Sequence, residues 1–90
     1  MLFMYIHTHA PDKCIVDQPK ELLQLFSAVR VGFQNTGVKV VDAYSVPHEH
    51  TFYWLLDTDD IEHLEVALRP MTKMGTARLI PIVKQPYMLS

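Results

Sequence analysis

The chain has 90 residues, of which 49% are hydrophobic and 20% are charged, and its formal net charge is −2. This length accommodates one small domain, so we expect residues 1–90 to form a single folding unit. The eight lysines and arginines are scattered along the chain and form no basic cluster. Without such a cluster to neutralise phosphates, nucleic acid is not expected as a partner.

The sequence also argues against a membrane or secreted protein. No segment approaches the roughly 18 apolar residues that a membrane span requires, and the apolar start of the chain lacks the features of a signal peptide. Cys14 is the single cysteine, so no disulfide can form within the chain. We therefore expect a cytoplasmic protein with no membrane partner.

The predicted elements begin with a strand over residues 2–9, which is rich in β-branched and aromatic residues. A helix follows a short loop, and we expect Asp17 to cap it and Pro19 to occupy its first position. Gly37 suits the left-handed residue that ends such a helix. The apolar residues of the helix recur at intervals of four, three and four, the spacing of one helix face: Leu22, Phe26, Val29 and Phe33.

Two strands come next, over residues 38–46 and 51–57, joined by a short connection that contains a proline. A second helix is predicted to begin at a capping box formed by Asp59 and Glu62. Pro70 is expected to end or kink this helix near residue 69, because proline lacks an N–H and clashes with the preceding turn.

The last predicted strand covers residues 77–83 and contains Pro81, which belongs on an edge strand because it cannot donate to a ladder. Residues 85–90 are predicted to be a tail, in which Tyr87, Met88 and Leu89 are available to dock on a partner. The order β-α-β-β-α-β predicts an α+β, ferredoxin-like fold with a four-stranded antiparallel sheet and two helices on one face. Right-handed crossovers place the first and third strands in the centre and the second and fourth at the edges.

Both faces of the two central strands are apolar, whereas two helices cover only one face of a sheet. We expect the other face to be buried by a second copy, giving a homodimer or higher homo-oligomer. Alternation along the strands places four aromatic residues on one side, which we predict to face the partner and to line a pocket: Phe3, Tyr5, Phe52 and Trp54.

Four of the five histidines form two His-x-His pairs, His7 with His9 and His48 with His50. With His7 opposite His50 and His9 opposite His48, all four gather at one end of the sheet, below the loop that contains Cys14. Imidazole and thiolate ligands suit zinc, nickel or copper, and the cluster therefore predicts a site for a divalent transition metal. Asp12 and Glu49 are further candidates, as ligands or as acceptors that orient a ring.

Three functions remain open from these residues. The first is a metal-binding protein, either a carrier, a sensor or a small metalloenzyme. The second is a metal-free enzyme in which a histidine acts as general acid or base on a small apolar or aromatic molecule, which would then be a ligand of the protein. The third is an assembly module whose role lies in its partner.

Four segments carry a family resemblance: the strands FMYIHTH and HTFYWLLD, the helix DDIEHLEVALRP and the closing GTARLIPIV. In their order and face pattern they resemble small stand-alone domains of the dimeric α/β-barrel superfamily, which includes muconolactone isomerase-like proteins and antibiotic-biosynthesis-type monooxygenases. The resemblance implies two sheets packed face to face and a pocket between sheet and helices or loops. It implies no particular reaction, because members share architecture and differ in chemistry.

Overall fold

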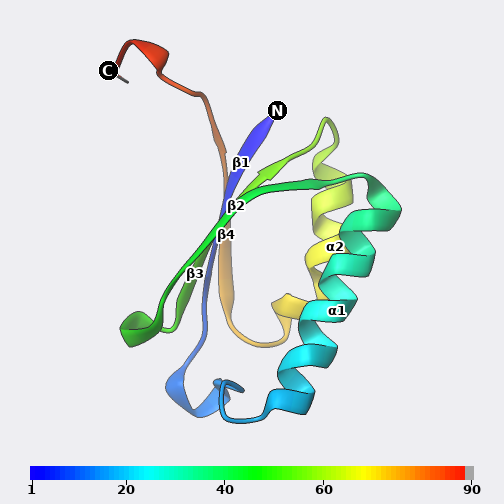
Figure 1. The fold of residues 1–90 in the computed structure, drawn as a ribbon, viewed down its shortest axis with the longest axis vertical. Helices are drawn as coiled ribbons and strands as arrows, with labels where there is room; N and C mark the ends of the chain where they lie inside the picture. The colour runs from blue at the N-terminus through cyan, green and yellow to red at the C-terminus, as the bar shows by residue number, and fades with distance from the viewer. Residues whose placement is uncertain (89–90) are drawn as a thin grey trace.

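The computed structural model describes residues 1–88, which form a four-stranded antiparallel sheet with two helices on one face (Figure 1). The sheet order is β2-β3-β1-β4, which confirms the predicted ferredoxin-like topology and the placing of Pro81 on an edge strand. The described part of the chain contains no helix long and apolar enough to span a membrane. The strands and helices are β1 (Leu2–Thr8), α1 (Pro19–Thr36), β2 (Lys39–Val46), β3 (Thr51–Asp57), α2 (Ile61–Thr72) and β4 (Thr76–Ile82), with short 3-10 turns at Pro11–Lys13, Pro47–Glu49 and Pro86–Met88.

Helix α1 begins and ends where the proline and the glycine predict. Pro19 is its first residue, and Gly37 follows its last turn with a φ of 77°. The cap, however, is Gln18 and not Asp17, and its side chain makes no capping hydrogen bond. The prediction of Asp17 was wrong because Pro19 fixes the first helical position, so the cap must be the residue directly before it.

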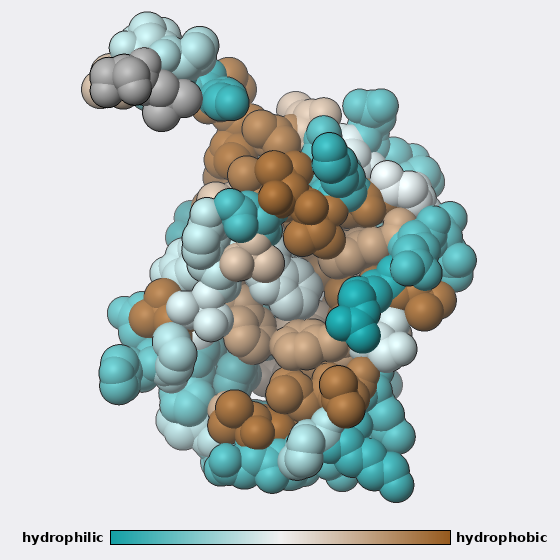
Figure 2. All heavy atoms as spheres, in the orientation of Figure 1, coloured by the Kyte–Doolittle hydropathy of each residue, from teal (hydrophilic) through white to brown (hydrophobic). Residues whose placement is uncertain are grey.

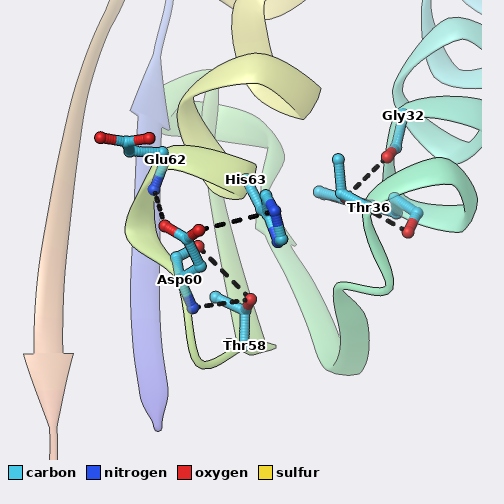
Figure 3. Close-up of polar contacts among 7 residues, drawn as sticks. Gly32, Thr36, Thr58, Asp60, Glu62 and His63 are labelled. Atoms are coloured by element: carbon cyan, nitrogen blue, oxygen red, sulfur yellow. Dashed lines mark hydrogen bonds and ion pairs between the residues drawn. The ribbon is translucent and has the colours of Figure 1, made fainter.

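Helix α2 is capped by Asp60, one residue later than the predicted Asp59. The Asp60 carboxylate accepts a hydrogen bond from the Glu62 N–H at 2.9 Å, and its second oxygen lies 3.5 Å from Nε2 of His63 (Figure 3). The helix continues past Pro70 to Thr72, so its predicted end near residue 69 was wrong. A proline so close to the end removes one backbone hydrogen bond, and burial of the next residue, Met71, holds the final turn in place.

The first strand turns its aromatic and histidine side towards the helices. Phe3, Tyr5, His7 and His9 are all buried. The prediction that this side faces a partner was therefore wrong. Alternation shows which side chains share a face, but both faces here are apolar, so the pattern did not show which face the helices cover. The core beneath the helices also includes Val29, Phe33, Leu56, Leu64, Ala67, Leu68 and Met71.

In the described part of the chain, no helix lies over the opposite face of the sheet (Figure 1). Cross-strand pairs on that face join Met4 to Leu55 and to Ile80, and Ile6 to Tyr53. These five side chains are only half-buried. The apolar surface expected for a second copy is thus present, on the face opposite to the predicted one.

The chain after β4 leaves the sheet and points away from it (Figure 1). Tyr87 and Met88 are largely exposed, at 79% and 70%. Leu89, the third tail residue predicted to dock on a partner, lies outside the described residues.

Gly75, in the turn before β4, lies directly against the end of β1. A Cβ atom built on it would overlap the carbonyl oxygen of Thr8 and would lie 2.9 Å from Cα of His9. These are backbone atoms, which cannot move aside as the tip of a flexible side chain can. Any side chain at position 75 would therefore push away the end of β1 and, with it, His9.

We predict that Gly75→Ala destabilises the fold by about 1–3 kcal/mol, the range for overpacking a site that cannot relax. Lys73→Ala, an exposed change in the same turn, is the control and should stay within about 0.5 kcal/mol of the parent. Urea unfolding of the three proteins measures the difference. Equal midpoints for Gly75→Ala and the parent would contradict the close approach.

Candidate metal centre

His9 and His50 lie side by side at one end of the sheet. The backbone N–H of His9 donates to the carbonyl of His50 at 3.1 Å, which extends the β1–β3 ladder by one step beyond the strands. The two rings meet edge to face, with centroids 5.3 Å apart. His7 lies opposite Phe52, so the predicted pairing of His7 with His50 was wrong by two residues. A shift of two residues keeps every side chain on its face, so the histidines of β1 still share one side.

The connection between β2 and β3 determines where the second histidine pair lies. Pro47–Glu49 form a 3-10 turn, and His50 follows it in the left-handed region, with φ 50° and ψ 45°. Histidine occupies this region more often than most residues, although it costs about 1 kcal/mol. This turn leaves His48 exposed and directs His50 back towards β1.

The loop after β1 brings a thiol to the same place. Its 3-10 turn is closed by a hydrogen bond from the Cys14 N–H to the carbonyl of Pro11, at 3.2 Å. Cys14 is half-buried. His9, Cys14 and His50 each offer one ligand atom, and these atoms all lie within 4.8 Å of one another. Two imidazoles and one thiolate form a donor set suited to zinc or copper.

His9 is the least satisfied polar group of the cluster. It is only 7% exposed, and neither of its ring nitrogens has a hydrogen-bond partner among residues 1–88. Burial lowers the pKa of His9, and the neighbouring His50 lowers it further. His9 is therefore neutral near pH 7, which is the form of imidazole that binds a metal.

His7 lies deeper in the core, next to His9 and away from the three-residue group. Its Nδ1 is 3.3 Å from the hydroxyl of Tyr5, and its ring stacks on Phe52. Burial raises the pKa of Tyr5 to about 12, so the hydroxyl stays protonated, and the ring tautomer of His7 decides whether this hydroxyl donates to Nδ1 or accepts from it. Nε2, the other ring nitrogen of His7, has no hydrogen-bond partner among the described residues.

The structure thus brings together three of the five predicted ligands, His9, Cys14 and His50. His7 and His48 lie outside this group within residues 1–88. Asp12 and Glu49, the additional candidates, are exposed and also lie outside it.

An apolar cavity of about 280 Å³ opens beside the three donors, between the end of the sheet and the first turns of α1. Its walls include His9, Cys14 and His50 together with Leu22, Leu25 and Phe26. A second cavity of about 480 Å³ lies between α1 and β2, and both cavities have Phe26, Ser45 and Phe52 in their walls. Apolar side chains gather between the sheet and α1 and at the lower end of the molecule (Figure 2).

The aromatic residues predicted to line a pocket divide into two groups. Phe52 lines both cavities and Trp54 lines the larger one, whereas Phe3 and Tyr5 are packed in the core. The sequence interpretation missed the part of α1 that lines the smaller cavity. The apolar stripe of the predicted helix could have indicated this wall. Its first residues, Leu22 and Phe26, are only half-buried because they border these cavities.

Comparison with known proteins adds information about the fold. No protein-family model matches this chain, and no curated protein matches it. Among solved structures, the chain is similar to SCO4226 from Streptomyces coelicolor A3(2), with a TM-score of 0.60 and 20% identity over 93% of this chain and 100% of that chain. At that identity the similarity supports the α+β fold alone.

The buried imidazole of His7 should make stability depend on pH. Burial, and secondarily the charge on His9, lowers the pKa of His7 below the ordinary value of 6.5. Below about pH 6.5 the unfolded chain then binds a proton that the folded chain does not, so stability is complete above that pH and falls as the pH decreases towards the folded pKa.

We predict that His7→Phe reduces this loss by up to about 1.4 kcal/mol per pH unit, the maximum for one proton. Urea unfolding between pH 7 and 5, with a chelator present, measures the slope. His48→Gln removes an exposed imidazole and should leave the slope unchanged. If His7→Phe and the parent have the same slope, His7 is not the group responsible.

Proposed function

We propose that this protein binds a divalent transition metal, zinc, nickel or copper, through His9, Cys14 and His50. The observation that supports this most strongly is His9, a buried imidazole with both ring nitrogens unpartnered among the described residues and two further donors beside it. An unpartnered buried polar group costs on the order of 1–3 kcal/mol, and a metal–nitrogen bond would offset that cost.

The arrangement of the donors supports a site that forms when the chain folds. His9 follows β1, Cys14 follows the first 3-10 turn and His50 follows the second. The side chains therefore come from three separate segments and meet in the native fold. A pre-arranged donor set of this kind binds a metal with little reorganisation.

The number of donors bears on the role. Three protein ligands leave the fourth position of a tetrahedral metal open, the pattern of catalytic zinc sites, whereas a closed four-ligand site is typical of structural ones. The same open position suits a carrier or a sensor, which must exchange its metal. We therefore propose a metal carrier, a sensor or a small metalloenzyme.

We predict that the protein binds about one metal per chain. His9→Ala or Cys14→Ser should weaken binding at least about 100-fold, because losing a residue that only hydrogen-bonds to a metal ligand already weakens metal binding by up to about 100-fold. Native mass spectrometry with zinc, nickel or copper, before and after chelation, measures the occupancy. His48→Ala is the matched control, because it removes an exposed imidazole from the same turn that positions His50. A protein that stays metal-free with all three ions would contradict the proposal.

A metal-free enzyme is the second candidate, and the cavity of about 280 Å³ favours it. The neutral ring of His9 forms part of a largely apolar wall, where it is suited to take a proton from a small apolar or aromatic molecule. If such a molecule raises the melting temperature of protein from which a chelator has removed all metal, this function is supported over the first.

We further propose that the open face of the sheet binds a second copy of the chain, as in the dimeric α/β-barrel superfamily that the sequence resembles. The supporting observation is the set of paired apolar side chains on that face, centred on Met4, Ile6 and Leu55. Burying side chains of this size contributes about 1.5–3 kcal/mol each.

We predict that Ile6→Lys converts the dimer to a monomer, because it places a charge in the middle of the buried face. Analytical ultracentrifugation measures the mass, and circular dichroism checks that the fold is retained. Val66→Lys, on the exposed side of α2, is the control and should remain dimeric. A monomeric parent protein would overturn the proposal.

A further inference from the structure

We infer that the open position of the metal accepts a small, uncharged apolar molecule that carries one nitrogen or sulfur donor. This inference rests on the proposed metal site and specifies its ligand class. Its basis is that the three donors form part of the wall of the cavity of about 280 Å³, so a metal bound to them would border that cavity.

The chemistry of the cavity wall favours a ligand that is apolar apart from its donor atom. Leu22, Leu25, Phe26 and Val46 line it, and within residues 1–88 no aspartate, glutamate, lysine or arginine does. Of its two hydroxyl residues, Thr51 is engaged, since its Oγ1 donates to the carbonyl of Glu49 at 2.9 Å. A charged ligand would lose its hydration here without gaining an ionic partner, whereas an apolar one gains by leaving water.

The size of the cavity selects a small molecule. About 280 Å³ is just below the range of about 300–1,000 Å³ that is usual for drug-sized ligands. The rings of Phe26 and Phe52, with centroids 6.0 Å apart, stand between this cavity and the larger one. A single aromatic ring or a short alkyl chain next to the donor therefore matches the space.

The cluster also borders a more polar part of the surface. His9 and His50 also border a wide, shallow depression whose lining includes Lys13, Glu49 and Lys73. The two histidines thus line both this depression and the apolar cavity. Cys14 lines the cavity and is not in the described lining of the depression, so a metal held by all three donors would lie on the side of the cavity.

The test uses protein loaded with cobalt(II), whose visible spectrum reports a change of metal ligands. Imidazole and 4-phenylimidazole offer the same donor, and only the second adds an apolar ring. We expect 4-phenylimidazole to bind about tenfold or more tightly than imidazole, because the ring is buried in the cavity. Equal affinities, or binding to chelated protein as tight as to loaded protein, would overturn the inference.

Two neighbouring leucines of α1 provide matched variants. Leu22→Gln changes the cavity wall and should remove the advantage of the phenyl ring, whereas Leu23→Gln alters a residue that is 66% exposed and should retain it. Metal loading of each variant is measured first, by mass spectrometry. Failure of the parent to load with cobalt, zinc, nickel or copper would overturn both the proposed function and this inference, whereas normal loading without a phenyl advantage would overturn the inference alone.

Discussion

The pairing of β1 with β3 is the constraint on which the rest of the site depends. One backbone hydrogen bond, from the His9 N–H to the His50 carbonyl, extends this pairing beyond the strands and fixes the two imidazoles side by side. A slip of one residue would move His9 to the open face of the sheet and dissolve the cluster. The hydroxyls of Thr8 and Thr51, 3.1 Å apart, and the close approach of Gly75 hold the same end of the sheet in this register.

This register places two imidazoles where a fold optimised for stability alone would place apolar side chains. His7 is fully buried and His9 nearly so, and three of their four ring nitrogens lack a partner among residues 1–88. Such groups destabilise the folded state unless something binds them. A ligand that binds only the folded state would stabilise that state by mass action and offset this cost. The cluster is therefore expected to be a site of binding and not of packing.

The sequence predicted the topology and the shared face of the histidines, because strand alternation and element order depend on local pattern. It did not predict the register, because Pro47–Glu49 form a 3-10 turn, and this shortens the ladder and separates His48 from His50. It also placed the aromatic side of β1 on the face towards a partner, whereas that side packs beneath the helices. With apolar residues on both faces, only the packing of α1 and α2 decides which face becomes the core.

The position of the three donors suggests how metal binding would affect the rest of the chain. Cys14 lies in a loop between β1 and α1, and apart from its own turn this loop is held by few described hydrogen bonds. A metal joining Cys14 to His9 and His50 would tie this loop to the end of the sheet. The same loop supplies Ile15 and Val16 to the wall of the apolar cavity. Metal binding and binding of a molecule in the cavity would then act on the same loop, and each would strengthen the other by reciprocal coupling.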